Sequence, residues 1–567
     1  MVNKKRVASL LKYSIILLAV AYVLLQLFVL FVEAAHGDKT FYLGLTNLPV
    51  LLFNFSAAAA MIEFLWSSRS RQRKRLGRQT SLPLIVAASV LCFGVVVGNA
   101  YELLFTIAFK DCESSKNLWF LYFDGFVYVV RMIFAPLSLT FVLQRRFFKL
   151  PSDDQFERAR AVLINVSLFV TTFRFWLDEG YSVLLYFCAL QTEMNSPSVY
   201  CPVKINYTDV ISVCDEPEAL MKSEWLWYSF HTNFFQRAYL LCAAEFFPVI
   251  FILHWLSYGG KLKGLFNFTS NSGALLRDLT LTMVKSANEM SQGNDNWVST
   301  AVRRPNEAAE TPRTAAELRE SNEQSSFAAT IFIRFLFISL GLLHAVLMLS
   351  YLGSLYVWSV KIDESTTEDN VASMALGIAA FAVQVIFFGF LTAWAAPLCR
   401  HHFCAHRMKH MHGDQTLLVC AAFGTLVHLP LDSVNGQIVR TALQLTAHFF
   451  QLVVLCRCLA LSDRALMRFR FFVPAVAITA AFSNFCAFCC MFMRLGIVHH
   501  LIHYKHYHMQ DKPHATLFVL SQSFYPADFL FYFTATLCWT EILARYIKMG
   551  FFSVGQVNSS AEQNAHA

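Results

Sequence analysis

The chain has 567 residues, of which 56% are hydrophobic and only 15% are charged, and its formal net charge is +8. The charged fraction is well below the roughly 25% of soluble domains, and apolar runs of roughly 17–28 residues recur about twelve times. Such runs cross a bilayer as helices, because a helix satisfies its own backbone hydrogen bonds in lipid. The composition therefore excludes a soluble, fibrous or disordered protein and predicts an all-α polytopic membrane protein with about twelve transmembrane helices.

Twelve apolar spans are predicted in chain order. They lie at residues 12–35, 41–66, 82–108, 119–143, 161–187, 232–257, 327–358, 373–397, 415–430, 438–461, 471–495 and 516–544. The ninth is the shortest and contains His428 and Pro430. The first follows the basic residues Lys4–Arg6, as in a signal peptide, but its apolar run is too long and Glu33–Ala35 is a poor cleavage site. We therefore expect a retained first helix.

The loops between the spans differ in positive charge. One set of alternate loops, beginning with residues 1–6, holds 30 Lys and Arg residues, whereas the other set holds 8. Positively charged loops stay in the cytosol. The pattern predicts a multi-pass protein of the plasma membrane with both termini in the cytosol.

The loop of residues 188–231 is then extracellular. It contains the glycosylation acceptor Asn206-Tyr207-Thr208. Four cysteines on the same predicted side are disulfide candidates, since disulfides persist outside the cell. They are Cys112, Cys188, Cys201 and Cys214. Sequence does not decide their pairing, and free thiols with an unused acceptor are the alternative reading.

Residues 258–326 form the longest polar stretch, rich in Asn, Ser, Glu and Thr, and we expect a cytosolic linker there. The linker separates a six-helix half at 1–257 from a six-helix half at 327–545, followed by a cytosolic tail at 546–567. Transporters and channels are often built from two such related bundles.

Charges at membrane depth usually face a protein interior or an aqueous cavity, although a charge near a helix end can reach the interface instead. Asp124 and Arg131 are seven residues apart and share one helix face, while Arg174 and Asp178 are spaced to pair. Glu245 lies deep in its span. The candidate residues for a polar pathway or gate in the first half are Glu102, Asp124, Arg131, Arg174, Asp178, Glu179 and Glu245.

The second half offers mainly amides and imidazoles. Gln444, His448 and Gln451 are spaced i, i+4 and i+7, so they line one helix face and can hold a water wire. Asn484 and Glu541 complete the predicted pathway of this half. The alternative for each is an ordinary interhelical hydrogen bond, which contributes about 1 kcal/mol or less in a membrane.

Histidines gather in two loops, at 401–412 and at 499–514. Three predicted spans separate the loops, so they lie on opposite sides of the membrane and cannot form one metal site. The second loop is predicted to face outside, where imidazoles can sense acid or bind Zn²⁺; a solvated surface loop is the alternative. Its candidate residues are His499, His500, His503, His506 and His508.

Four segments carry a family resemblance. The fifth span, VLINVSLFVTTFRFWLDEG, ends near Glu179, and the sixth, AYLLCAAEFFPVIFILHW, contains Glu245. The third, FGVVVGNAYELLF, contains Glu102, and the last, ADFLFYFTATLCWTEILARY, contains Cys538 and Glu541. Together with the twelve spans, cytosolic termini and central linker, these segments resemble the otopetrins, a family of proton-selective channels.

The resemblance implies a proton channel that conducts H⁺ into the cell when the outside is acid. It also implies a homodimer whose subunits each place two six-helix halves around a lipid-filled centre, with bilayer lipids, sterol included, as partners. Zn²⁺ inhibition is expected through the histidine loop. The chain departs from the family pattern at Asn165, Tyr532 and Thr534, where the family has His, Arg and His.

The chain shows no Gly-rich phosphate loop, G-x-S-x-G or H-E-x-x-H motif. We therefore expect no enzyme activity and no cofactor. Two alternatives stay open from the residues alone. The same buried carboxylates suit a proton-coupled secondary transporter, and the histidines suit an integral-membrane acyltransferase or oxidase.

Overall fold

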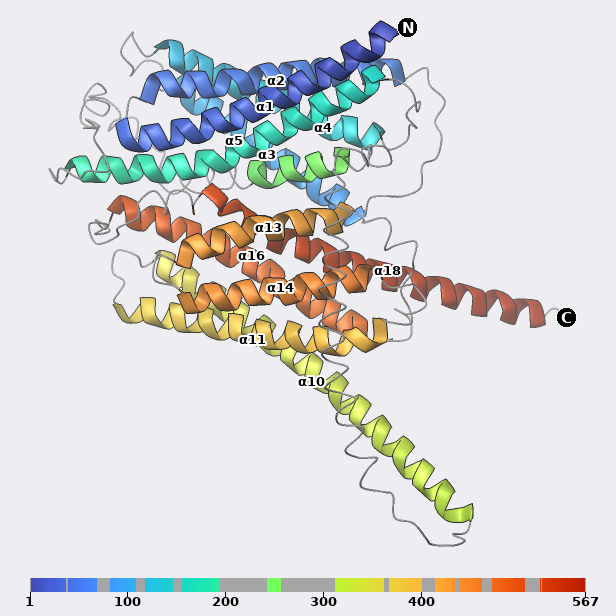
Figure 1. The fold of residues 1–567 in the computed structure, drawn as a ribbon. Helices are drawn as coiled ribbons and strands as arrows, with labels where there is room; N and C mark the ends of the chain where they lie inside the picture. Colours follow the sequence, from blue (N-terminus) through green and yellow to red (C-terminus); the bar gives the residue numbers. More distant parts are fainter. Residues whose placement is uncertain are drawn as a thin grey trace.

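A computed structural model of the chain is helical throughout the residues that it describes (Figure 1). The helices are α1 (Val2–His36), α2 (Lys39–Ser68), α3 (Leu82–Ala108), α4 (Leu118–Arg145), α5 (Gln155–Glu193), an unlabelled helix at Cys242–Trp255, α10 (Pro312–Val360), α11 (Thr367–Cys399), α13 (Gly413–Ser433), α14 (Ile438–Ala460), α16 (Phe472–Tyr504) and α18 (Pro526–Ala565). Besides these helices the structure describes residues 521 and 523–525. Side chains are described over 7–28, 47–66, 83–104, 122–123, 125–145, 156–177, 242–255, 332, 334–357, 372–393, 415–431, 438–459, 473–494, 521 and 523–548.

Nine of the described helices are long and apolar enough to cross a membrane. This confirms the prediction of an all-α, multi-pass membrane protein. The predicted sixth and ninth spans correspond to shorter apolar helices, at Cys242–Trp255 and Gln415–Leu431. The last helix, α18, is not among the nine, because Asp528, Glu541 and Arg545 make its apolar stretch more polar.

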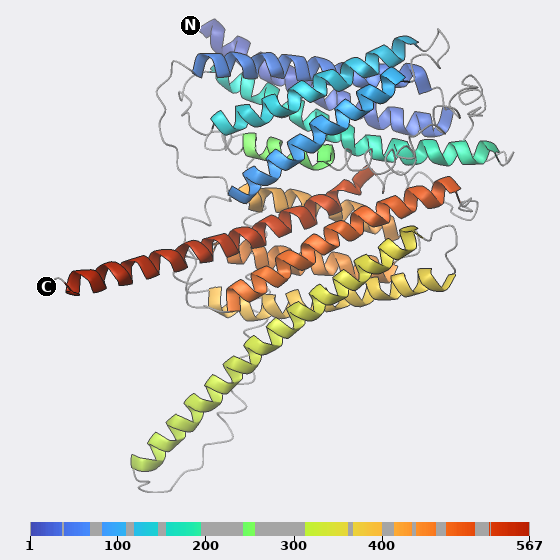
Figure 2. The same ribbon diagram turned by 180° about the vertical axis from the view of Figure 1, so that it is seen from behind.

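The helices pack in two groups, which lie one above the other in Figures 1 and 2. The first helix group consists of α1–α5 and Cys242–Trp255, and its main contacts join α3 to α4, α1 to α5, and α2 to both α4 and α5. The second helix group consists of α10, α11, α13, α14, α16 and α18, in which α16 packs on α10 and α18, and α11 packs on α14. Smaller contacts, α5 with α16 and α3 with α18, connect the groups.

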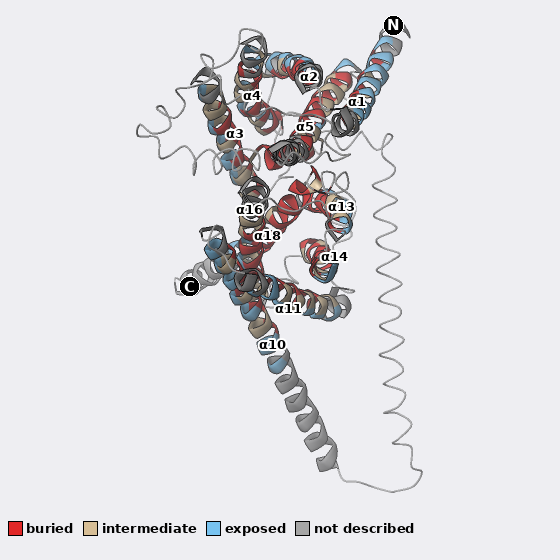
Figure 3. Ribbon diagram, turned by 90° about the vertical axis from the view of Figure 1, so that its left-hand side faces the viewer, coloured by how far each residue is buried: buried red, intermediate tan, exposed pale blue. Residues whose placement is uncertain are grey.

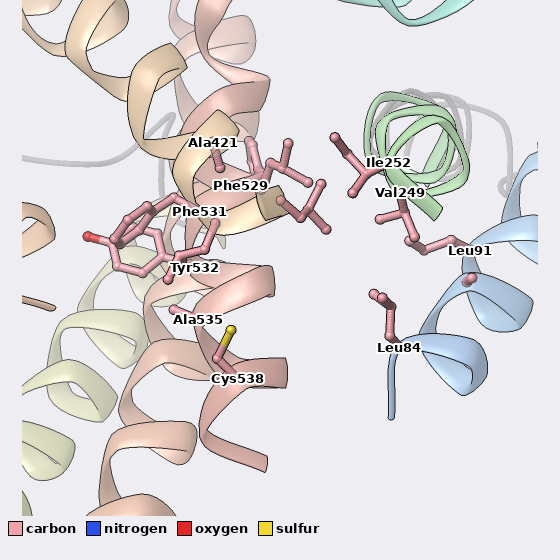
Figure 4. Close-up of a cluster of buried hydrophobic side chains, with 14 of the residues drawn as sticks. Leu84, Leu91, Val249, Ile252, Ala421, Phe529, Phe531, Tyr532, Ala535 and Cys538 are labelled. Atoms are coloured by element: carbon pink, nitrogen blue, oxygen red, sulfur yellow. The ribbon is translucent and has the colours of Figure 1, made fainter. Parts of the chain in front are cut away.

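A buried apolar cluster continues from one group into the other (Figure 4). Leu84 of α3 and Val249 of Cys242–Trp255 belong to the first group, and Ala421 of α13 and Phe529 of α18 belong to the second. Since one cluster includes residues of both groups, a displacement of α13 or α18 can be transmitted by packing to the first group.

The outward faces of the helices are apolar, as lipid contact requires (Figure 3). On α1, Leu10, Leu17 and Leu24 recur every seven residues and are 71%, 70% and 61% exposed. Such faces would be costly in water, because folding in water is driven by removing apolar area from solvent. In a bilayer they are the expected surface, and polar side chains are accordingly concentrated between the helices.

Candidate functional site

Glu245 is the most deeply buried carboxyl group among the described side chains of the first helix group. It lies on the helix Cys242–Trp255, its side chain is 0% exposed, and neither carboxylate oxygen has a hydrogen-bond partner among the described residues. An unpaired charge in such surroundings is very costly, and a carboxyl group avoids that cost by holding a proton. These surroundings favour the protonated form of Glu245 and do not provide a structural ion pair.

Two arginines of the first group are buried against specific partners. The Arg131 guanidinium lies 4.6 Å from the centre of the Phe175 ring and also interacts electrostatically with Glu102, which is partly buried on α3. Arg174 donates from Nη1 to Oε1 of Gln26 on α1, at 3.2 Å. These contacts place positive charge beside the predicted carboxylate path and hold α1, α3, α4 and α5 together.

A buried amide on α2 joins this helix to hydroxyl groups on two successive turns of α5. Oδ1 of Asn54 accepts hydrogen bonds from Ser167 Oγ at 2.8 Å and from Thr171 Oγ1 at 2.9 Å. Sequence reasoning missed Asn54 and Gln26. Each is a single polar residue inside an apolar run, and that was the only signal that could have pointed to them.

In the second helix group, α13, α14 and α18 meet at His428, Gln444 and Asp528. Nε2 of His428 lies 3.6 Å from Oδ2 of Asp528, and Gln444 donates from Nε2 to the same oxygen at 3.1 Å. Nδ1 of His428 lies 2.8 Å from the carbonyl oxygen of Ser521. All three side chains at the centre of this site are buried.

The contacts of Nδ1 with Ser521 bear on which ring nitrogen of His428 carries the hydrogen. The hydroxyl of Ser521 also lies 3.3 Å from this nitrogen. A carbonyl oxygen only accepts, so the shorter of the two contacts favours the tautomer with a hydrogen on Nδ1. If the ring is neutral, Nε2 is then a bare acceptor that faces the carboxylate of Asp528. Two acceptors repel, and one additional proton, on His428 or on Asp528, turns the repulsion into attraction. In this tautomer His428 and Asp528 share one proton, and the pair is called the one-proton site below.

A second polar chain crosses the middle of the same group. Gln384 of α11 donates to Gln451 of α14 at 3.5 Å, and Gln451 donates to Asn484 of α16 at 2.7 Å. Asn484 Nδ2 donates to the Ala480 carbonyl at 2.6 Å. Amides do not take up protons near neutral pH, so this chain fixes the helices and can order water but does not itself bind a proton.

His448 lies between these two sets of contacts. It stacks on Phe531 with ring centres 4.0 Å apart, Tyr532 approaches at 4.8 Å, and neither ring nitrogen has a hydrogen-bond partner among the described residues. Gln444, His448 and Gln451 are all buried on one face of α14, as their spacing predicts, but they face different partners. His344 of α10 is a similar buried imidazole, beside Phe387 and Phe388; it is one of the polar residues inside the predicted spans but not part of the predicted pathway.

Several predicted site residues lie outside the described side chains. Asp124, Asp178 and Glu179 belong to α4 and α5, but their side chains are not described, and the same holds for His499, His500 and His503 at the end of α16. Cys188 lies in the last part of α5, and its side chain is likewise not described. His506, His508, Cys112, Cys201, Cys214 and Asn206 lie entirely outside the described residues. Glu541 is partly buried on α18. Within the described part of the chain, no group of three His, Cys, Asp or Glu residues could hold a metal ion.

A comparison of the chain with protein-family models gave no match, and a comparison with curated proteins gave none either. The functional argument therefore depends on two buried groups of titratable side chains, Glu245 in the first helix group and His428–Asp528 in the second.

Proposed function

We propose that the protein is a proton-selective ion channel that conducts H⁺ into the cell when the outside is acid. The contact between His428 and Asp528 is the observation that carries the proposal, because an imidazole and a carboxyl group this close at membrane depth can share and exchange a proton. Glu245 supplies a second titratable group in the other helix group. Titratable groups at membrane depth are typical of proton relays.

The surroundings of the two sites favour protons over other cations. Na⁺ needs several oxygen ligands or a hydrated passage, whereas a proton needs only water molecules and groups that exchange it. Among the groups around this pair, Gln444 donates to Asp528 and the imidazole of His448 interacts electrostatically with His428. The guanidinium of Arg440 interacts electrostatically with Tyr532, as Asp528 does. In the first group, Arg131 and Arg174 add positive charge that opposes metal cations.

The sequence resemblance to the otopetrins supports the same proposal. We accordingly propose a glycosylated homodimer of the plasma membrane with cytosolic termini, in contact with bilayer lipids and sterol, and without enzyme activity. Each subunit would carry one proton site in each helix group. As the helices fluctuate, protons would pass from water on one side of the membrane to these sites, and from the sites to water on the other side.

Whole-cell recording during steps of extracellular pH tests the function. We expect inward current on acidification, a reversal potential that shifts by about 59 mV per pH unit as for a singly charged ion, and no shift when Na⁺ is replaced. A chain carrying both Glu245→Gln and Asp528→Asn, at equal surface amount, is the matched control and should lack the current. Current that depends saturably on an added solute would instead identify a proton-coupled transporter.

A further inference from the structure

The helix Cys242–Trp255 contains a proline one turn after its buried carboxylate. Pro248 has no N–H, so the carbonyl of Ala244, four residues earlier, lacks its usual helical donor. Trp176 of α5 replaces that donor: its Nε1–H donates to the Ala244 carbonyl at 3.3 Å. Ala244 directly precedes Glu245, so the indole holds the backbone at the position where this helix is weakened and where it carries its titratable group.

Both described ends of this helix contact neighbouring helices closely. Before the proline, Cys242 lies so close to Gly94 of α3 that a Cβ on this glycine would come within 2.5 Å of its sulfur. After the proline, Nδ1 of His254 lies 2.7 Å from Oδ1 of Asn165 on α5. Prolines are the commonest cause of sharp bends in helices. With its two ends held, the helix can bend between them, in the segment that carries Glu245.

The same indole contacts the second helix group. The ring of Trp176 lies edge-on to Phe524 with ring centres 6.2 Å apart, and a Cβ on Gly424 of α13 would lie 3.7 Å from its Cη2. Gly424 precedes His428 by one helical turn, and Phe524 precedes Asp528 by four residues. One side chain therefore contacts the backbone beside Glu245 through its N–H and the segments that carry His428 and Asp528 through its ring.

We propose that Pro248 and Trp176 form a hinge in Cys242–Trp255, and that Trp176 is a positioning residue that links Glu245 to the His428–Asp528 site. Trp176 acts through the backbone and the helices around it rather than by touching either proton site. A shift of α13 or α18 on protonation moves the indole, and the indole then changes the bend at Ala244 and the position of Glu245. The hinge is a structural claim, whereas the positioning role rests on the proposed proton conduction.

A cycle of two substitutions tests the proposal. Trp176→Phe keeps an aromatic ring but removes the N–H, and Pro248→Ala gives residue 248 an N–H that can bond the Ala244 carbonyl. We expect Trp176→Phe alone to reduce acid-evoked current about 2- to 10-fold, the range of one lost hydrogen bond, and to shift the pH at half-maximal current. In the Pro248→Ala background the same substitution should change the current and its pH dependence little.

Trp539→Phe is the matched control, because Trp539 is also buried and its Nε1 has no hydrogen-bond partner among the described residues. It should leave both the current and the pH at half-maximal current unchanged. A Trp539→Phe effect equal to that of Trp176→Phe would overturn the positioning role, because any buried indole would then behave alike.

The thermal unfolding midpoint of the purified full-length protein, measured for the wild type, both single variants and the double variant, tests the hinge without reference to transport. Trp176→Phe should lower the midpoint in the wild-type background and lower it less in the Pro248→Ala background. Equal lowering in both backgrounds would overturn the hinge. If the effects of the two substitutions on the unfolding midpoint were non-additive but the pH dependence of the current stayed unchanged, the positioning role would be overturned. If the wild-type protein carried no proton current, the proposed function would fail, whereas the unfolding cycle would still decide the hinge.

Discussion

Gly424 of α13 packs directly on Ala527 of α18, so closely that a Cβ on Gly424 would collide with the Cβ of Ala527. The α13–α18 contact is the one across which His428 faces Asp528. His428 follows Gly424 by one turn, and Asp528 is the residue after Ala527. The missing side chain at position 424 therefore sets the helix separation that brings the imidazole to 3.6 Å from the carboxylate.

We predict that Gly424→Ala forces α13 and α18 apart. Overpacking of this kind costs about 1–3 kcal/mol in free energy of unfolding, and the longer separation should lower the acid-evoked current. Adding Ala527→Gly removes the colliding Cβ and leaves the Cα of residue 527 at 3.7 Å, an ordinary contact. The double variant should therefore regain both stability and current, as measured by thermal unfolding and whole-cell recording.

Gly353→Ala on α10 is the control for this pair. Nothing among the described residues lies within 4 Å of a Cβ at position 353, so alanine should be neutral or stabilise the helix by about 0.5–1 kcal/mol. If Gly424→Ala behaved like Gly353→Ala, the close approach of α13 and α18 would not matter for the His428–Asp528 site.

The one-proton site predicts strong non-additivity between His428 and Asp528. Asp528→Asn removes the carboxylate that shares the proton, and His428→Gln removes the imidazole, so either change alone should abolish proton exchange at this site. The double variant should then be no worse than either single variant in acid-evoked current. Glu63→Gln is a suitable control, because Glu63 forms an exposed ion pair with Arg160 that contributes little. Strictly additive losses would show that the two side chains act separately.

The buried carboxyl group of Glu245 should support the acid-evoked current but lower the free energy of unfolding. Glu245→Gln keeps the volume but cannot release a proton, so it should reduce acid-evoked current without loss of surface protein. Glu245→Leu removes an unpartnered buried polar group and should raise the free energy of unfolding by about 1–3 kcal/mol while also reducing the current. Wild-type current in both variants, with unchanged pH dependence, would make Glu245 a structural residue.

The difference between Gln444, His448 and Gln451 shows what the sequence can and cannot predict. Their spacing predicts a shared helix face, and all three are buried together. Their partners come from other helices: Gln444 meets Asp528 and Gln451 meets Asn484, while His448 stacks on Phe531. Periodicity along one helix carries no information about which distant helix covers it, so the roles could not be predicted.

The same limit applies to the contacts that join the two helix groups. Apolar runs predict where α5 and α13 lie in the sequence, because run length reports the thickness of the bilayer. The Trp176–Ala244 hydrogen bond and the Gly424–Ala527 contact depend on helix rotation and crossing. A proline after Glu245 and a glycine before His428 were visible in the sequence, but the residues that complete each contact are distant along the chain.

The topology prediction follows from the unequal positive charge of the loops. We expect both termini to be cytosolic and residues 188–231 to be extracellular, with a glycan on Asn206 and disulfides among the four predicted outer cysteines. Epitope tags at either end should be accessible to antibody only after permeabilisation, and glycosidase treatment should increase gel mobility. An Asn206→Gln chain is the control for the glycan. A tag that stains intact cells, or four free thiols in non-reducing mass mapping, would reverse the prediction.

The histidine loop at residues 499–514 should act as an acid and zinc sensor. It contains six imidazoles, and α16 continues to Tyr504, so His499 and His503 lie four residues apart on one helix, a spacing suited to binding one Zn²⁺. As external pH falls from about 7 to 5.5, the imidazoles gain positive charge together. The charged rings then repel Zn²⁺ and also repel one another. Zinc inhibition should therefore weaken in acid.

Replacing all six histidines of this loop by Gln tests the sensor in whole-cell recordings at several external pH values, with and without Zn²⁺. The six-fold variant should lose zinc inhibition and shift its pH at half-maximal current, because both effects need the imidazoles. The histidine loop at 401–412 supplies the control. His410→Gln should change neither quantity, since that loop is predicted to be cytosolic and external Zn²⁺ does not reach it. Unchanged zinc sensitivity and pH dependence in the six-fold variant would identify the 499–514 loop as a solvated surface.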